Sequence, residues 1–210
     1  MKSTEFITED INVEDVQKYV ELIKQDCGPF LQQAKGEYLY RGLGTETDPF
    51  VGNSIRLKNR TPKDVPLLLH NNINKFFNKK FGSPFRNAMF CSGDIHFADF
   101  YGKIYVVFPI GKFEFLWSTD VDDLFMSWDE YDPSLSPDFK QLSQESQEID
   151  FKDAIKTFLK DTKNTYINDN LAQAIKSNNE IMIRCERYYA VKLDIVQDPI
   201  YNFERLMNEK

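Results

Sequence analysis

Two runs of β-prone residues, separated by a turn, constrain this chain more than any other feature. Residues 104–108 (Ile-Tyr-Val-Val-Phe) and 113–117 (Phe-Glu-Phe-Leu-Trp) are dominated by β-branched and aromatic side chains. The turn residues Pro109, Ile110 and Gly111 lie between them. Two such runs joined by a short loop that contains glycine are typical of a β-hairpin. The sequence therefore predicts an antiparallel pair of strands in the middle of the chain.

Helices are expected on both sides of this pair. Apolar residues recur at helical spacing in the first segment, which ends near Gly28-Pro29. A second helix is expected to begin at Thr61, its N-cap, with Pro62 in its first turn. Before it, the stretch 43–60 is rich in Gly, Thr, Asp and Asn and predicts a long loop. The predicted helices cover about 13–26, about 61–81, and segments that begin at about 150 and about 168.

The order of these elements favours an α+β fold. Helices are followed by a short strand at 38–40, another helix, strands, further helices, and the last strands at about 181–191, without βαβ alternation. A chain of 210 residues fits one domain, so we interpret 1–210 as a single domain with an N-terminal helical segment at about 1–35. The stretch 129–149 is rich in Ser and Glu and predicts a surface insertion.

Composition excludes several classes of protein. The acidic start lacks an apolar run, and no stretch approaches the ~18 apolar residues of a membrane span, so we expect a cytoplasmic protein without membrane contact. Three widely spaced cysteines indicate reduced thiols. Two histidines argue against a His-rich metal centre or a Ser-His-Asp triad, and no metal site is expected. Walker, GxGxxG, GxSxG and HExxH motifs are absent from the sequence.

The net charge of −7 is unevenly distributed along the chain. Residues 52–86 carry eight basic side chains and one acidic, whereas residues 114–150 carry eleven acidic and one basic. Two solvated faces explain such a distribution. A basic wall near a phosphate-bearing ligand, facing an acidic lobe, explains it equally well.

Three polar residues adjoin short β-prone runs. Arg41 follows Tyr38-Leu39-Tyr40, Ser92 follows Met89-Phe90-Cys91, and Glu180 precedes Ile181-Met182-Ile183. In order and spacing they resemble the Arg-Ser-Glu branch of the ADP-ribosyltransferase superfamily, over about residues 38–193. That family carries an arginine at the end of its first strand, an aromatic-x-Ser motif on the next, and a glutamate at the start of a late strand. The resemblance implies a split β-sheet core flanked by helices, and NAD as substrate.

The resemblance also implies a role for each residue. Glu180 would stabilise the positive charge that develops on the ribose as the nicotinamide bond of NAD breaks. Arg41 would bind phosphate or ribose oxygens. Gly42 would let the backbone approach the nicotinamide amide. Ser92 would bond Glu180 or the ribose and so fix the rotamer of the carboxylate.

Aromatic and basic residues complete the expected NAD site. Tyr101 resembles the family's aromatic residue that stacks on nicotinamide, with Phe97 and Phe100 as close rivals. Arg60, in the basic piece between the first two motifs, would hold the NAD pyrophosphate near the start of the following helix. Arg86 is the second choice for that role. Charges that merely rim a surface helix explain the two arginines as well.

Two departures from the family pattern bear on the acceptor. Asn178 stands where arginine-modifying members carry the first residue of Glu-x-Glu. Since an amide cannot deprotonate a guanidinium, Asn178 favours a nucleic acid or a non-arginine protein site as acceptor. The serine motif also keeps only one of three hydroxyls, as Cys91-Ser92-Gly93.

The resulting hypothesis is an NAD-dependent mono-ADP-ribosyltransferase that modifies a macromolecule. A toxin, a toxin-antitoxin component or an effector in phage conflict and antiviral defence would fit, with an antitoxin or another regulatory protein as partner. One alternative is a catalytically inactive binding or structural protein with the same fold. Another is a nucleic-acid-binding module that uses the basic stretch 52–86 with stacked aromatic rings.

Overall fold

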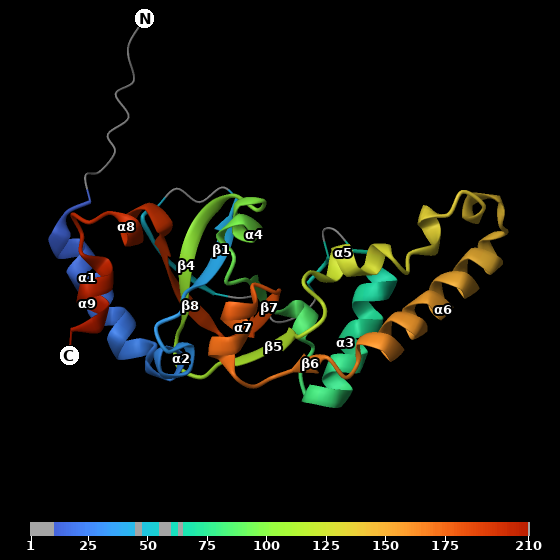
Figure 1. Cartoon of the computed structure of the whole chain (residues 1–210), viewed down its shortest axis with the longest axis horizontal. Coiled ribbons are helices and arrows are strands. Elements are labelled where there is room, and N and C mark those ends of the chain that lie inside the picture. Colours follow the sequence, from blue (N-terminus) through green and yellow to red (C-terminus); the bar gives the residue numbers. More distant parts are fainter. Residues whose placement is uncertain (1–10, 45–47, 55–59, 63–64, 210) are drawn as a thin grey trace, which may run out of the picture.

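The computed structural model describes residues 11–44, 48–54, 60–62 and 65–209, which form two antiparallel β-sheets surrounded by helices (Figure 1). The first sheet contains, in spatial order, β1 (Leu39–Leu43), β4 (Lys103–Pro109), β8 (Arg187–Lys192) and β2 (Phe50–Ser54). The second contains β3 (Met89–Cys91), β7 (Ile181–Arg184), β5 (Glu114–Ser118) and β6 (Tyr166–Ile167). This architecture confirms the α+β class.

The predicted hairpin of residues 104–117 is wrong, although both of its strands exist. β4 pairs with β1 and β8 in the first sheet, while β5 pairs with β7 and β6 in the second. In the connection, Ile110 N–H donates to the carbonyl of Arg187 at 3.0 Å, and Gly111 N–H donates to that of Asp26 at 2.8 Å. The turn thus connects one sheet to the other, and neighbouring elements satisfy its backbone donors.

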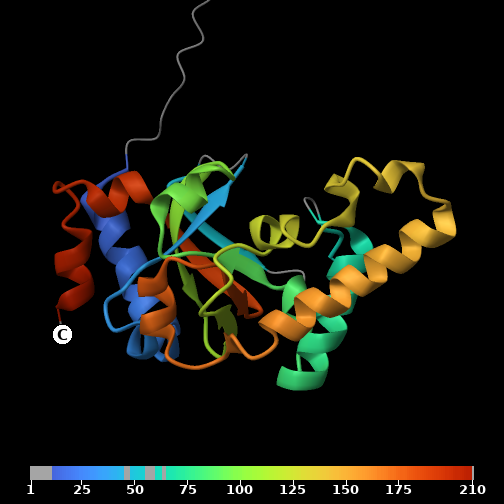
Figure 2. The ribbon, with the colours of Figure 1, turned by 45° about the vertical axis from the view of Figure 1, so that its right-hand side comes forward.

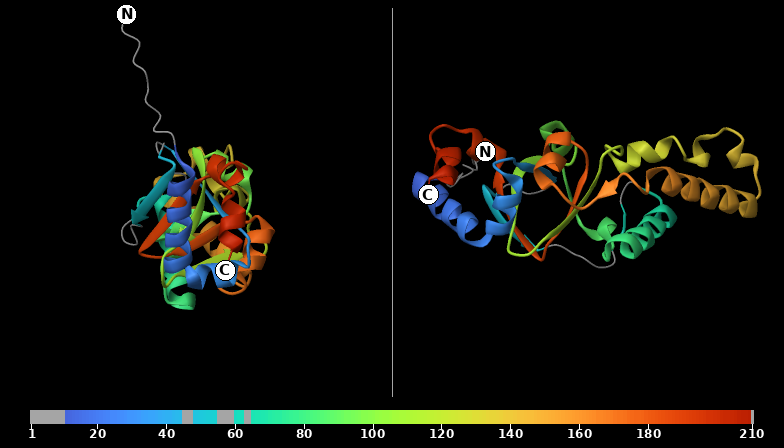
Figure 3. Two further views of the ribbon diagram at one scale, coloured as in Figure 1. Left: turned by 90° about the vertical axis from the view of Figure 1, so that its left-hand side faces the viewer. Right: turned by 60° about the horizontal axis from the view of Figure 1, so that its bottom comes forward.

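Helices from both ends of the chain pack against the first sheet. They are α1 (Val13–Asp26), α2 (Gly28–Ala34), α8 (Leu193–Gln197) and α9 (Phe203–Asn208), and α1 lies beside α9 (Figure 3). α1 buries Val16, Val20 and Ile23, which share one face at helical spacing. With α7 (Leu171–Ser177) they enclose a core that includes both sheets.

A second core lies on the opposite face of the second sheet. Along β5, Phe115 and Trp117 belong to the first core, whereas Leu116 between them belongs to the second. This two-residue alternation, with both faces buried, explains why the three central residues of the strand are all apolar. α3 (Leu67–Phe81) and α6 (Gln144–Thr162) cover the second face (Figure 2), and α3 contributes Ile73 and Phe77.

Three element boundaries differ from the sequence prediction. α3 begins at Leu67, with Pro66 as its N-cap, and not at Thr61. The proline disfavours helical geometry in the residue before it, so no helix extends back through this point. The expected loop 43–60 contains β2, and its residues 45–47 and 55–59 lie outside the described part. The helix expected from about 150 already begins at Gln144, where Ser143 caps it.

Residues 119–165 leave the second sheet and return to it at the same point. Ser118 and Tyr166 are paired across β5 and β6, and Thr119 N–H donates to the Thr165 carbonyl at 3.1 Å. The segment contains α5 (Leu124–Asp129), two short 3-10 helices, η2 (Pro133–Leu135) and η3 (Phe139–Gln141), and α6. It extends away from the sheets as an elongated lobe (Figure 1).

Candidate functional site

The two sheets meet where Tyr40 of β1 pairs with Ser92, the residue after β3. Tyr40 N–H donates to the Ser92 carbonyl at 2.8 Å, and Ser92 N–H donates to the Tyr40 carbonyl at 3.1 Å. β3 in turn pairs with β7, whose first residue directly follows Glu180. These pairings bring Arg41, Ser92 and Glu180 into one region, although the three are distant in sequence.

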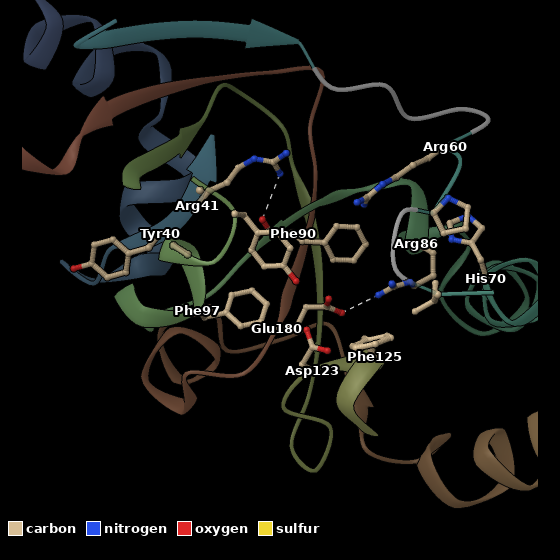
Figure 4. A pocket seen from close by; sticks show the side chains of 15 residues that line it. Tyr40, Arg41, Arg60, His70, Arg86, Phe90, Phe97, Asp123, Phe125 and Glu180 are labelled. Atoms are coloured by element: carbon tan, nitrogen blue, oxygen red, sulfur yellow. Dashed lines mark hydrogen bonds and ion pairs between the residues drawn. The ribbon is translucent and has the colours of Figure 1, made fainter. Parts of the chain in front are cut away.

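Arg41 lies within β1 and not after its end, since it pairs with Tyr105 of β4. Its Nη1 donates to the carbonyl of Phe90 at 3.3 Å (Figure 4). Its Nε is buried and has no hydrogen-bond partner among the described residues. A buried donor without an acceptor costs about 1–3 kcal/mol.

Gly42 is required for a different reason from the expected one. A Cβ on this residue would lie 2.2 Å from the carbonyl oxygen of Ala98 and 2.8 Å from Cβ of Tyr101. α4 (Ile95–Asp99) and the residues after it therefore pack directly on the glycine. Gly42 does line the cavity described below, but the space that its missing side chain leaves is filled by protein.

Ser92 is fully buried, and its hydroxyl is used within the backbone framework. Its Oγ donates to the carbonyl of Asn178 at 2.7 Å and accepts from the N–H of Asp94 at 3.0 Å. The expected contact with the Glu180 carboxylate is therefore replaced by one with the backbone two residues earlier. Ser92 therefore holds the backbone of the segment that leads to Glu180. It is not among the residues that line the cavity.

Glu180 is placed between α7 and β7, with 8% of its surface exposed. Its backbone N–H donates to the carbonyl of Asp122 at 2.7 Å, and its Oε1 accepts from Nη1 of Arg86 at 2.8 Å (Figure 4). Burial raises the pKa of Glu180 from 4.5 to about 7, the positive charge of Arg86 opposes this rise, and the charge of Asp123 adds to it. A carboxyl group that titrates near neutrality inside a cavity is typical of a functional site.

Arg86 is held in turn by a polar cluster of His70, Asn74 and Asn87. Arg86 and Asn87 belong to the 3-10 helix η1 (Phe85–Asn87), and the other two lie on α3. Asn74 Oδ1 accepts from the backbone N–H of Arg86 at 2.8 Å, and Asn74 Nδ2 donates to Asn87 Oδ1 at 3.1 Å. His70 Nε2 lies 3.2 Å from Asn87 Oδ1. Burial and then the charge of Arg86 lower the pKa of His70, which favours a neutral imidazole.

Two guanidinium groups contact the ring of Phe90. The Cζ of Arg60 lies 4.0 Å from the ring centroid and that of Arg86 lies 4.5 Å from it. Arg60 Nη1 also donates to the carbonyl of Ala88 at 3.0 Å. Figure 4 shows these two arginines on one side of Phe90 and Arg41 on the other. Arg56 and Lys58, the basic residues that precede Arg60 in this stretch, lie outside the described part of the chain.

These side chains line a cavity with about 760 Å³ of empty space, open solvent at its mouth included. The lining combines three guanidinium groups with the carboxyl groups of Asp123 and Glu180. The aromatic rings of Tyr40, Phe90, Phe97, Tyr101 and Phe125 also line it. A concave site lined by aromatic rings with a few convergent polar groups is the usual form of a small-molecule site.

The three aromatic candidates for stacking are unequal. Tyr101 and Phe97 both line the cavity, with their ring centroids 5.6 Å apart. Phe100 is 87% exposed and lies outside the lining. Asn178, the candidate residue on the acceptor side, is exposed and ends α7 in a left-handed conformation with φ of 64°. It is not part of the lining, so its contact with an acceptor stays a prediction.

Sequence reasoning missed the polar cluster and Asp123. His70 and Asn74 are four residues apart on α3, on a face otherwise made of Leu69, Ile73 and Phe77. Polar residues inside an apolar helical face were the available signal, because buried polar groups need partners. Asp123 caps α5 by accepting from the N–H of Met126 at 3.0 Å. Because aspartate is a common N-cap residue, nothing in the sequence around it indicated a place in the cavity.

Comparisons of the chain with protein-family models, with curated proteins and with solved structures find no match. Within the described residues, no three His, Cys, Asp or Glu side chains come together as metal ligands. In the same part of the chain, no helix combines the length and apolar character needed to cross a bilayer. The cavity itself is therefore the basis for a functional proposal.

Proposed function

We propose that this chain is an ADP-ribosyltransferase that cleaves NAD and transfers ADP-ribose to a macromolecular acceptor. The observation that carries the proposal is the cavity that Glu180 shares with Arg41 and Gly42. These residues belong to the segments in which the sequence resembles the Arg-Ser-Glu branch of the superfamily. Two antiparallel sheets joined through Tyr40 and Ser92 suit the split β-sheet core that the resemblance implies.

The charges and rings of the cavity are complementary to NAD. The dinucleotide carries a negatively charged pyrophosphate, and guanidinium groups bind phosphate oxygens through paired hydrogen bonds. Arg41 has a buried Nε without a partner among the described residues, and Arg60 lines the same cavity. NAD also carries two flat ring systems, for which Phe97 and Tyr101 offer aromatic faces.

Glu180 would act on the charge that develops during the reaction. When the bond between ribose C1′ and the nicotinamide nitrogen breaks, neutral nicotinamide leaves with the electron pair and positive charge stays on the ribose. The acceptor nucleophile then forms a bond to C1′ and releases its proton. An ionised carboxylate fixed beside the ribose stabilises that positive charge. Because the pKa of Glu180 lies at about 7, activity should rise with pH across neutrality.

The acceptor is proposed to be a nucleic acid or a non-arginine site on a protein. Asn178 precedes Glu180 by two residues. Its amide can hydrogen-bond a nucleobase but cannot accept a proton from a guanidinium. A cytoplasmic effector in phage conflict, controlled by an antitoxin or a similar regulator, is the biological role that we propose for such an enzyme.

The test uses the purified chain with NAD labelled in its ADP-ribose part and a cell lysate from which protein and RNA are afterwards separated. We expect label in one of the two fractions and release of nicotinamide. Glu180→Gln should lower both by about 100-fold or more, as removal of a group that stabilises transition-state charge does. The matched control is Glu21→Gln, on the exposed face of α1.

Two results would contradict the proposal. One is the absence of both label and released nicotinamide with the intact chain. The other is undiminished labelling by Glu180→Gln. The inactive alternative has its own signature, because a ligand that binds only the folded state raises the unfolding temperature. A higher Tm in millimolar NAD without any turnover would favour that alternative.

A further inference from the structure

We propose that Arg86 positions the carboxylate of Glu180, a role that the family resemblance assigns to Ser92. The catalytic meaning of this inference rests on the proposed function. The pairing itself belongs to the fold and can be tested without turnover. Arg86 is thus a positioning residue, which acts on the reaction through Glu180.

The two side chains of the pair are close together and largely buried. Arg86 Nη1 lies 2.8 Å from Glu180 Oε1, and the two side chains are 8% and 9% exposed. A guanidinium offers several donors in a fixed planar arrangement, so a carboxylate bonded to it is restricted in direction as well as in distance. Ser92 does not compete for the carboxylate, because its hydroxyl donates to the backbone of Asn178.

Arg86 can position its partner because it is itself held from two directions. Its backbone N–H donates to Asn74 Oδ1 at 2.8 Å, and Asn74 is bonded to Asn87 and lies beside His70. Its guanidinium lies on the ring of Phe90. The Nε of Arg86 is buried without a partner among the described residues. Neighbouring side chains thus fix both the backbone and the guanidinium of Arg86.

The charged groups around Glu180 determine the direction in which its pKa should change when one of them is replaced. Arg86 and Arg60 lower the pKa of Glu180, and Asp123, at the start of α5, raises it. Burial raises the pKa of Tyr166 on β6, and the charge of Glu180 adds to this rise. Loss of Arg86 should therefore move the titration of Glu180 to higher pH, and loss of Asp123 should move it to lower pH.

The experiment follows the side-chain carboxyl of Glu180 by ¹³C NMR from pH 4 to pH 9, with the signal assigned by its loss in Glu180→Gln. Arg86→Gln should raise the titration midpoint, and Asp123→Asn should lower it. Arg184→Gln is the matched control, because Arg184 is another arginine with a carboxylate partner, Glu114 at 3.3 Å, on β7 itself. It should leave the midpoint of Glu180 unchanged.

Activity adds a second readout. Arg86→Gln should lower kcat by about 100-fold, the effect of a misplaced reacting group, with a smaller change in KM. The acidic limb of its pH–rate profile should move to higher pH. Arg86→Lys keeps the charge and lacks the planar fork, so it should restore the midpoint and only part of kcat. If Arg86→Gln does not fold, full wild-type kcat in Arg86→Lys would overturn the inference.

Failure of the two proposals can be told apart. A wild-type chain that neither cleaves NAD nor transfers ADP-ribose overturns the proposed function, and the NMR titration still decides whether Arg86 controls Glu180. An unchanged midpoint in Arg86→Gln overturns the inference even if the wild type is fully active.

Discussion

Tyr40 and Ser92 donate backbone hydrogen bonds to each other, at 2.8 and 3.1 Å, although Tyr40 lies in the first sheet and Ser92 follows a strand of the second. The pairing aligns the residues that follow. Arg41 reaches the carbonyl of Phe90, and Gly93 lies directly against α7. The position of the proposed catalytic carboxylate, at the end of α7, therefore depends on contacts made around Ser92.

Replacement of Gly93 by alanine tests this dependence. A Cβ at position 93 would lie 1.9 Å from the carbonyl oxygen of Ile175, and α7 would have to move away. We expect Gly93→Ala to lower the free energy of unfolding by about 3 kcal/mol, the upper end of the usual cost of overpacking. Urea denaturation measures it. Gly28→Ala is the control, because nothing lies within 4 Å of a Cβ there; equal effects of both changes would contradict the prediction.

The titration of Glu180 predicts a pH-dependent stability. Its pKa is about 7 in the folded chain against an ordinary 4.5, so the native state binds this proton more tightly. The resulting stabilisation is complete below pH 4.5 and is lost as the pH rises through 7. The difference corresponds to about 3 kcal/mol.

Glu180→Gln removes this dependence, because an amide does not titrate. Between pH 4.5 and pH 8, the unfolding free energy of Glu180→Gln should gain roughly 3 kcal/mol relative to wild type. Denaturation curves at several pH values measure the gain. Glu21→Gln should keep a constant difference from wild type, and a constant difference for Glu180→Gln as well would show that burial does not raise its pKa.

Arg41 should contribute to NAD affinity. Loss of a hydrogen bond to a charged group costs about 1.5–3 kcal/mol, so Arg41→Gln should raise the Kd for NAD by about 10- to 100-fold. Calorimetric titration measures the Kd, and circular dichroism checks folding. Arg205→Gln, on exposed α9, provides the comparison. An unchanged Kd in Arg41→Gln would remove this residue from the proposed NAD site.

Asn74 should matter for stability more than its polar character suggests. Alanine at this position leaves the backbone N–H of Arg86 without its acceptor and removes one of the hydrogen-bond partners of Asn87 Oδ1. Because unsatisfied buried groups are costly, we expect a loss of about 3 kcal/mol. In the same helix, the side chain of Asn72 donates, among the described residues, only to the carbonyl of Leu68 at 2.8 Å, so Asn72→Ala should cost much less. Thermal unfolding compares the two, and equal losses would count against the cluster.

The sequence located strands and candidate residues better than it located their partners. Alternation of buried side chains along β5 marks a strand, but nothing local says whether it pairs with β4 or with β7. Likewise Glu180 stood out beside an apolar run, whereas its partner Arg86 lies 94 residues away. Pairings at such distances are set by the assembly of both cores. The prediction that Thr61 caps α3 was wrong for a local reason, because Pro66 disfavours helical geometry before it and is itself the N-cap.

Residues 119–165 leave the second sheet and return to it at one point, although their buried side chains, such as Trp128 and Phe158, belong to the second core. Ser118 and Tyr166 are paired neighbours, so a short turn between them would close β5 and β6 into a hairpin. Such an excision would leave Arg41, Arg86 and Glu180 in the chain and would remove the cavity wall supplied by Asp123 and Phe125. Arg41, Arg86 and Glu180 of the proposed site, and the wall of the cavity that Asp123 and Phe125 supply, thus lie in different segments of the chain.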